Sequence, residues 1–289
     1  MDAGELSSST ASASSILEKP FIYGTAWKED ETKRLTRLAI EQGFRGIDTA
    51  NQRKHYHEVA VGEAVREAIR DGIVSREELF LQTKFTFQSG QDHRLPYDPA
   101  ASIADQVGQS LASSLEHLGV NYLDSYILHG PSRGAGLHAN DWEAWYAMEQ
   151  LHDAGRMRTI GISNVSFDQL KTLLAKCRIA PTYVQNRCYA TQAWGRDVRE
   201  LCRKHGMFYQ AFSLLTANAK ILSHPSLIEI ASKHKRQVTQ VVFRFAIDAG
   251  MIPLTGTSQP EHMRTDLGAF DFDLNAEEVK RIEQVAIAN

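Results

Sequence analysis

The chain has 289 residues, and its 32 Lys and Arg nearly balance its 35 Asp and Glu, which gives a formal net charge of −3 at neutral pH. It contains no basic block that would attract nucleic acid or an anionic membrane surface, so we expect neither as a partner. The three cysteines, Cys177, Cys188 and Cys202, are odd in number and form no CxxC pair, which argues against a disulfide framework or a metal site and fits a reducing compartment. Small-molecule chemistry is the class of function that this composition favours.

The N-terminal segment, residues 1–17, is rich in Ser and Ala and lacks the charged and apolar regions of a targeting peptide. We expect it to be a flexible tail, followed by one domain over residues 18–289, in a cytoplasmic protein that is a monomer or a weak homo-oligomer. No apolar run approaches the ~20 residues that span a bilayer. The length suits a single (β/α)8 barrel, which typically takes about 250 residues.

Short apolar runs rich in β-branched and aromatic residues alternate with longer helical patterns along the chain, which is typical of repeated βα units. We predict eight strands: Phe21–Thr25, Phe44–Ala50, Leu79–Lys84, Leu123–His129, Thr159–Asn164, Thr182–Arg187, Phe208–Ser213 and Met251–Thr255.

Two predicted helices have especially clear patterns. The first has apolar residues at steps of four and three, which form one face for packing on a sheet: Ile103, Val107, Leu111, Leu115 and Leu118. The second, near the C-terminus, begins with a capping box of Asn275 and Glu278. A doubly wound open sheet would show the same alternation of strands and helices. The count of eight strands and the lack of a GxGxxG turn after the first strand favour a closed α/β barrel, the (β/α)8 or TIM barrel.

Polar residues end several of the predicted strands. Asp48 lies at the end of the second, Lys84 at the end of the third and His129 at the end of the fourth. In a (β/α)8 enzyme the reactive groups lie at the carboxyl ends of the strands, so we expect these side chains to meet at one mouth of the barrel.

This set, with a tyrosine on the loop after Asp48, suits proton donation to a carbonyl oxygen that receives a hydride. Tyr56 is the candidate donor, because a neighbouring ammonium, that of Lys84, would stabilise the phenolate and lower the pKa of the phenol. Asp48 would hold the ammonium in place, and His129 would hydrogen-bond the substrate oxygen. Each residue alone has a structural explanation, as a cap, a snorkelling lysine or a surface side chain, but four together favour a catalytic site.

The ordered motifs of the chain resemble those of the aldo-keto reductases from about residue 20 onward. They are Gly24-Thr25-Ala26-Trp27, Gly46-Ile47-Asp48-Thr49-Ala50, Gln82-Thr83-Lys84, Leu128-His129-Gly130-Pro131, Gly161-Ile162-Ser163-Asn164 and Val184-Gln185-Asn186. The resemblance implies reduction of an aldehyde or ketone to the alcohol by NADPH, or by NADH, with Asp48, Tyr56, Lys84 and His129 as the catalytic residues.

The same resemblance implies where the cofactor and the substrate bind. Ser163, Asn164 and Gln185 would hydrogen-bond the nicotinamide carboxamide. Other cofactor contacts are expected from Gly24, Thr25, Trp27, Phe212, Ser213, Leu214, Thr255, Gly256, Thr257, His262 and Arg264. The substrate pocket would include Trp27, Phe87 and Gly130, and Trp142, Trp145 and Trp194 could border it.

The sequence departs from the family pattern at three places. The loop from Asp48 to Tyr56 is slightly long, which leaves His55 as an alternative proton donor. Phe212 stands where the family usually has a tyrosine that stacks on nicotinamide, and a phenyl ring can still stack. Leu254 replaces the first residue of a Lys-Ser pair that commonly binds the adenosine 2′-phosphate, which weakens the preference for NADPH over NADH.

Two alternatives to a reductase remain open from the sequence. One is a Schiff-base lyase with Lys84 as the nucleophile. The other is a protein on the same fold that senses NADP(H) and signals to a partner without rapid chemistry, because fold alone does not establish function.

Overall fold

The computed structural model describes residues 20–286, so the predicted tail over residues 1–17 lies outside the described part of the chain. Eight parallel strands form a closed barrel in the order of the sequence, β1 to β8, with β8 pairing back onto β1. Their bounds are Ile22–Gly24 (β1), Gly46–Asp48 (β2), Phe80–Phe85 (β3), Leu123–Leu128 (β4), Met157–Ser163 (β5), Tyr183–Arg187 (β6), Phe208–Phe212 (β7) and Met251–Thr255 (β8). The prediction of a single-domain (β/α)8 barrel is confirmed.

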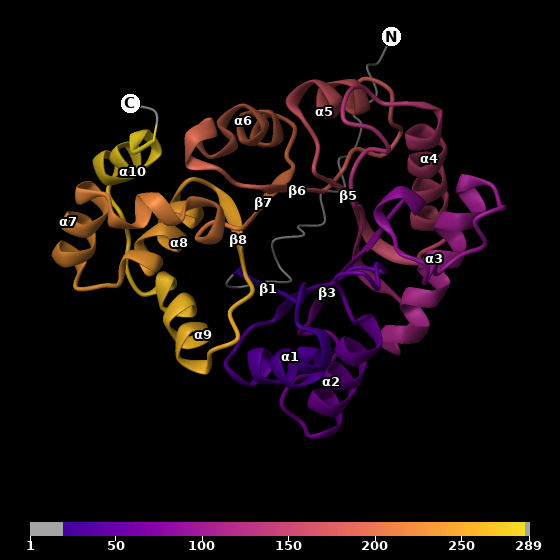
Figure 1. The fold of residues 1–289 in the computed structure, drawn as a ribbon, viewed down its shortest axis with the longest axis horizontal. Coiled ribbons are helices and arrows are strands. Elements are labelled where there is room, and N and C mark those ends of the chain that lie inside the picture. Colours follow the sequence, from indigo (N-terminus) through magenta and orange to yellow (C-terminus); the bar gives the residue numbers. More distant parts are fainter. Residues whose placement is uncertain (1–19, 287–289) are drawn as a thin grey trace, which may run out of the picture.

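Helices follow the strands and form an outer ring around the barrel (Figure 1). They are Thr32–Glu41 (α1), Glu58–Arg70 (α2), Ile103–Leu118 (α3), Ala139–Asp153 (α4), Phe167–Leu174 (α5), Arg196–Lys204 (α6), Pro225–His234 (α7), Val238–Asp248 (α8), Pro260–Leu267 (α9) and Ala276–Gln284 (α10). Short 3-10 segments lie at Glu29–Glu31, Gln88–Gly90, Ala190–Gly195, Thr216–Ser223 and Gly268–Phe270.

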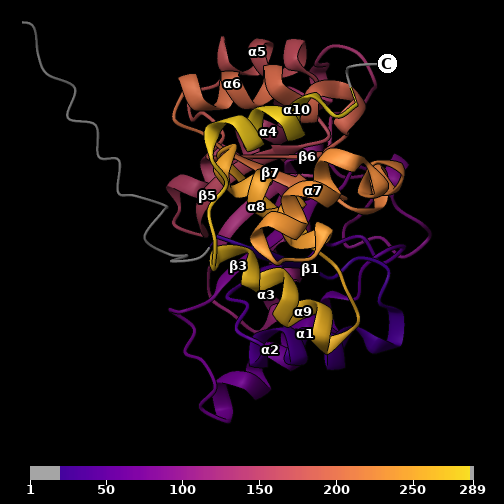
Figure 2. The same cartoon turned by 90° about the vertical axis from the view of Figure 1, so that its left-hand side faces the viewer.

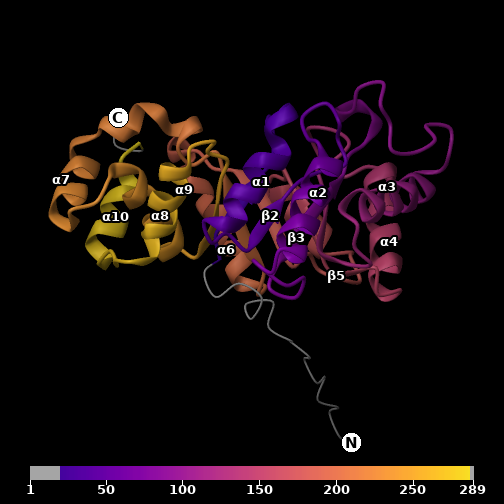
Figure 3. The same cartoon turned by 90° about the horizontal axis from the view of Figure 1, so that it is seen from below.

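The ring of helices closes where its last members meet its first. Helix α9 contacts α1, and the two lie side by side in all three views (Figures 1, 2 and 3). Helix α10 packs on α7 and α8, so the three form a small cluster at one end of the molecule (Figure 3). Its first turn is capped by Asn275, whose side chain accepts from the Glu278 amide while Glu278 accepts from the Asn275 amide, as the sequence predicts.

Two apolar cores follow from the alternation of side chains along each strand. The larger core lies between the barrel and its helices and includes the predicted face of α3, with Val107, Leu111 and Leu115 buried. The smaller cluster contains Ile22, Phe80, Ile127, Tyr183, Ile252 and Leu254, which come from strands spaced around the barrel. These side chains fill the barrel interior, so the barrel is packed rather than open.

Glycines make room for this interior packing at two strand positions. A Cβ on Gly46 would lie 2.9 Å from Ile22 Cγ1, and one on Gly161 would lie 2.4 Å from Ile127 Cδ1. Because larger side chains from neighbouring strands occupy that space, the interior layer depends on the absence of side chains at these two positions.

Candidate active site

A cavity of about 860 Å³ opens at the carboxyl ends of the strands. Its lining comes from loops that follow all eight strands. Most of the predicted site residues line it: Gly24, Trp27, Asp48, Tyr56, Phe87, His129, Gly130, Ser163, Asn164, Gln185, Phe212, Ser213, Leu214, Thr255, Gly256, Thr257 and His262. Parallel βα units therefore bring together residues that are more than 200 positions apart.

Three predicted residues lie outside this lining. Thr25 is buried behind the cavity and donates from Oγ1 to the Asp48 carbonyl at 3.0 Å. Arg264 donates to Gln42 Oε1 at 3.1 Å, which directs its guanidinium toward the end of α1 rather than into the cavity. Thr25 and Arg264 therefore do not line the cavity, and their cofactor contacts stay a prediction. Lys84 also lies outside the lining, where its ammonium contacts Asp48 and the ring of Tyr56.

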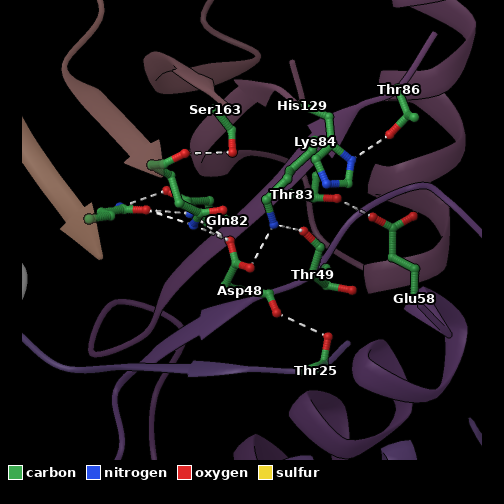
Figure 4. Close-up of polar contacts among 12 residues, drawn as sticks. Thr25, Asp48, Thr49, Glu58, Gln82, Thr83, Lys84, Thr86, His129 and Ser163 are labelled. Atoms are coloured by element: carbon green, nitrogen blue, oxygen red, sulfur yellow. Dashed lines mark hydrogen bonds and ion pairs between the residues drawn. The ribbon is translucent and has the colours of Figure 1, made fainter. Parts of the chain in front are cut away.

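Lys84 is fully buried and is held by two oxygen atoms. Its ammonium donates to Asp48 Oδ2 at 2.6 Å and to the Thr49 carbonyl at 2.7 Å (Figure 4). Burial is the main influence on this ammonium and lowers the pKa of Lys84, while the Asp48 carboxylate opposes that effect. The two oxygen atoms hold the ammonium in one position next to the cavity.

Asp48 is itself held by a layer of amide side chains. Its Oδ1 accepts from Gln82 Nε2 at 2.6 Å and from Gln185 Nε2 at 3.1 Å. Gln82 also exchanges hydrogen bonds with Gln210. This buried layer fixes the carboxylate, because the side-chain amides of Gln82, Gln185 and Gln210 also hydrogen-bond one another.

Tyr56 lies beside Lys84 and His129. The Lys84 ammonium is 5.2 Å from the centroid of the Tyr56 ring, and the ring centroids of Tyr56 and His129 are 5.9 Å apart in an edge arrangement. The alternative donor His55 instead stacks on Trp27 with ring centroids 3.9 Å apart. Of the two candidates, Tyr56 is the one that lies beside Lys84.

The pKa of Tyr56 differs from the sequence prediction. Burial raises the pKa of the phenol well above its ordinary range, and the Asp48 carboxylate raises it further. The lowering expected from Lys84 is wrong for the protein alone, because burial and the negative charge of Asp48 both disfavour a phenolate. The phenol is therefore held in its neutral form, which is the form that can donate a proton.

The loop that carries Tyr56 is fastened to the loop after β3. Gln52 Nε2 donates to the Gly90 carbonyl at 2.6 Å, and Gln91 Nε2 donates to the Asn51 carbonyl at 2.8 Å. The Tyr56 amide donates to the Gln52 carbonyl at 3.0 Å. These bonds hold the slightly long loop between Asp48 and Tyr56 in place.

His129 forms the opposite wall. Its Nδ1 lies 2.7 Å from Thr86 Oγ1 (Figure 4), and its carbonyl accepts from Asn164 Nδ2 at 2.8 Å. Burial holds the pKa of His129 well below its ordinary value, with the neighbouring charges of Lys84 and His55 acting in the same direction. The imidazole is therefore neutral at physiological pH.

Ser163, Asn164 and Gln185 lie together at the ends of β5 and β6. Ser163 Oγ donates to the Gln185 carbonyl at 2.6 Å and accepts from Asn164 Nδ2 at 3.2 Å. The amide groups of Asn164 and Gln185 donate to His129 and Asp48, which leaves Asn164 Oδ1 and Gln185 Oε1 as acceptors beside the cavity. This arrangement can receive the two hydrogens of an outside amide.

Several lining residues were missed by the sequence prediction. Thr86 follows Lys84 at the spacing of two that keeps side chains on one face of a strand, and this alternation could have revealed it. Arg187 ends β6 and places its guanidinium 5.5 Å from the Phe212 ring centroid. Lys28 donates to the Gly256 carbonyl across the cavity from the loop after β1. Asp266 on α9 accepts from Thr255 Oγ1 at 2.8 Å.

Three residues around the mouth have left-handed backbone conformations that non-glycine residues rarely adopt. Trp27 has φ +62°, Asn164 has φ +52° and Ser213 has φ +59°. Such strain persists only where the surroundings impose it, and it often marks ligand sites. Trp27, with 68 % of its surface exposed, is held at the rim of the cavity.

The other tryptophans do not border the cavity. Trp145 and Trp194 are fully buried in the outer core, and Trp142 packs beside Tyr146 on α4. Within residues 20–286 no group of three or more His, Cys, Asp or Glu side chains is placed to hold a metal ion. Over the same residues, no helix is both long and apolar enough to cross a membrane.

Comparisons with known proteins agree with this geometry. The family model described as "Aldo/keto reductase family" matches residues 20–287. The aldo-keto reductase AKR2E4 of Bombyx mori is 32 % identical over 268 residues, which are 88 % of this chain and 82 % of that protein. The uncharacterized oxidoreductase YtbE of Bacillus subtilis is 29 % identical over 253 residues, covering 88 % and 83 % of the two chains.

Solved structures match as well. The crystal structure of Bombyx mori AKR2E4 in complex with NADP has a TM-score of 0.76 at 28 % identity and covers 92 % of this chain and 88 % of that one. The aldo-keto reductase MGS-M4, from a Medee basin deep-sea metagenome library, has a TM-score of 0.80 at 26 % identity, with coverages of 94 % and 93 %. With its barrel, its matched length and its family model, the chain belongs to the aldo/keto reductase family of oxidoreductases.

Proposed function

We propose that this protein reduces an aldehyde or ketone to the alcohol, with NADPH as the preferred cofactor, NADH as the alternative, and Tyr56 as the proton donor. The observation that carries the proposal is the buried Lys84–Asp48 pair, with the Tyr56 ring 5.2 Å from the ammonium and the neutral His129 on the other side. These four groups have the chemistry that a carbonyl oxygen needs as negative charge develops on it.

The cavity residues fit a nicotinamide cofactor. Asn164 Oδ1 and Gln185 Oε1 are acceptors for the carboxamide NH₂, and the face of Phe212 is available for stacking. Lys28 and Arg187 supply positive charge that suits the phosphates, together with backbone donors near the start of α9. Bound NADPH supplies a hydride, and the proton must then come from the chain.

The residues of the chain account for that proton. A substrate oxygen between Tyr56 and His129 gains basicity as the carbonyl becomes an alkoxide, and the phenol then donates its proton. The Lys84 ammonium stabilises the phenolate that remains, and Asp48 keeps the ammonium in position. The raised pKa of Tyr56 prevents loss of the proton before substrate is bound.

The lyase alternative finds no support in the position of Lys84. Its Nζ donates to Asp48 and Thr49 and does not line the cavity, so a substrate carbonyl has no direct path to it. A protein that only senses NADP(H) would bind the cofactor in the same cavity. It would differ from a reductase in showing no turnover of a carbonyl substrate.

The test is reduction of a reactive aromatic aldehyde, followed by the absorbance of NADPH and, separately, of NADH. We expect Tyr56→Phe to lower kcat by at least about 100-fold, the usual size of general-acid catalysis, while the Kd of the cofactor stays the same. His55→Gln is the matched variant of the alternative donor. If His55→Gln abolishes turnover and Tyr56→Phe does not, His55 is the donor. Tight cofactor binding without turnover in the wild type contradicts the assignment as a reductase.

A further inference from the structure

Thr86 lies next to the imidazole of His129. Gln82 and Lys84 lie on β3, and Thr86, one residue beyond its end, continues the same spacing of two, which directs the three side chains to one face. Its Oγ1 lies 2.7 Å from His129 Nδ1 (Figure 4), and the residue is 6 % exposed.

Both partners of this contact are held in place. The Thr86 carbonyl accepts from Tyr97 Oη at 2.8 Å, and a Cβ on Gly90 would lie 2.8 Å from Thr86 Cγ2, so the side chain is tightly packed. The His129 amide donates to the Phe85 carbonyl at 2.8 Å, and its carbonyl accepts from Asn164. The hydroxyl and the ring nitrogen therefore keep one relative position.

The direction of the hydrogen bond follows from counting donors and acceptors. Within residues 20–286, His129 Nδ1 is the partner of the Thr86 hydroxyl. If Nδ1 carried the hydrogen, the hydroxyl hydrogen of this nearly buried side chain would have no acceptor among the described residues, and loss of that hydrogen bond costs free energy. If the hydroxyl donates, both its hydrogen and the lone pair of Nδ1 are satisfied.

We propose that Thr86 is a positioning residue that sets the tautomer of His129, so that Nε2 carries the hydrogen and donates it to the carbonyl oxygen of the substrate. The inference rests on the proposed function, because it gives the donor atom for the substrate of that same site. Nδ1 is occupied by Thr86, and Nε2 is the nitrogen left for the cavity. The Thr86 hydroxyl, two residues after Lys84, thus determines which ring nitrogen of His129 can donate a hydrogen bond to the substrate.

The first test measures the tautomer directly and needs no turnover. In the full-length protein with ¹⁵N-labelled histidine and NADP⁺ bound, we expect the His129 shifts of a neutral ring with hydrogen on Nε2. Thr86→Val has nearly the same shape but no donor, and we expect it to move the ring toward the other tautomer, whereas Thr86→Ser keeps the wild-type pattern. A wild type with hydrogen on Nδ1, or a Thr86→Val protein with unchanged shifts, overturns the inference.

The second test measures rate. Thr86→Val should lower kcat for an aldehyde about tenfold, which corresponds to about 1.4 kcal/mol, with the Kd of NADPH unchanged, and Thr86→Ser should restore most of the rate. Equal kcat in wild type and Thr86→Val contradicts the inference.

The matched control is Thr83→Val. The Thr83 hydroxyl donates to Glu58 Oε1 at 2.5 Å on the outside of β3. Its loss should lower stability and leave the His129 shifts unchanged, which separates a structural effect from a tautomer effect. If the shifts are those inferred and no carbonyl is reduced, the tautomer assignment stands and the proposed function fails.

Discussion

Asp266 is buried, and within residues 20–286 its carboxyl forms no ion pair with a Lys, Arg or His side chain. Burial raises its pKa to about 6, and the hydrogen bond from Thr255 offsets only part of that effect. Because the folded pKa is above the unfolded value, the folded state binds more protons than the unfolded state between about pH 4 and pH 6. Stability contributed by this group is therefore present at low pH and is lost as the pH rises through 6.

We expect Asp266→Asn to remove this dependence. Urea unfolding should show that the wild type loses about 1 kcal/mol between about pH 5 and pH 8 through this group, and that the loss is absent in the variant. The asparagine side-chain oxygen can still accept the hydrogen bond from Thr255 Oγ1. The two proteins should therefore have similar free energies of unfolding at pH 5. A variant with the same pH profile as the wild type would show that the carboxyl titrates normally.

At the residue scale the sequence predicted which residues gather around the cavity wherever strand ends carried the signal. Asp48, His129 and Gln185 could be placed because parallel strands bring their carboxyl ends together. Arg264 lies outside the cavity lining, which the sequence did not reveal because a position on a helix does not say which way a long side chain turns. The direction of the Tyr56 pKa was missed because burial, its main cause, cannot be judged from a loop sequence.

Among the elements, the strands followed their predicted positions closely. β8 has the predicted bounds, and β5 begins two residues earlier than predicted because Met157 pairs with Leu123 on β4. β2 is shorter than predicted, at Gly46–Asp48, although the Thr49 amide beyond its end still donates to the Gln82 carbonyl on β3. Periodicity predicts which residues form a strand, while its ends depend on partners that are distant in sequence.

The contact between α2 and α3 depends on Gly62. A Cβ at this position would lie 2.0 Å from the His117 carbonyl oxygen and 2.7 Å from Leu118 Cα, both on the backbone of α3. We expect Gly62→Ala to lower the free energy of unfolding by about 1–3 kcal/mol in a urea titration, because the helices must separate.

Gly108→Ala is the control for this substitution. A Cβ on Gly108, within α3, meets nothing within 4 Å. Alanine is the better helix former, so this variant should be more stable by about 0.5–1 kcal/mol. Equal effects of the two substitutions would contradict the close approach of α2 and α3.

For the whole molecule, the cavity draws its lining from the first strand to the last helices of the barrel. Gly24 at the end of β1 lines it together with Thr255 and Gly256 at the end of β8, where the barrel closes. Binding should therefore stabilise the closed barrel as a unit.

We expect NADPH at about 100 times its Kd to raise the free energy of unfolding by about 2.7 kcal/mol. A thermal shift assay with NADPH and NADH at equal concentrations then ranks the two cofactors, with the larger shift for the tighter one. Tyr56→Phe should show the same shift as the wild type. A shift from neither cofactor would contradict the proposed site.

The three residues with left-handed backbone at the mouth of the cavity lower the stability of the fold while they supply side chains to the cavity. Trp27, Asn164 and Ser213 each hold a backbone conformation that glycine would adopt freely, at a cost of about 1–3 kcal/mol apiece. Selection for heat resistance alone would therefore favour glycine at these positions and would remove an aromatic rim, an amide and a hydroxyl from the cavity. Thermostable variants of this enzyme should be sought among substitutions in the outer helices, where stability can rise without dismantling the site.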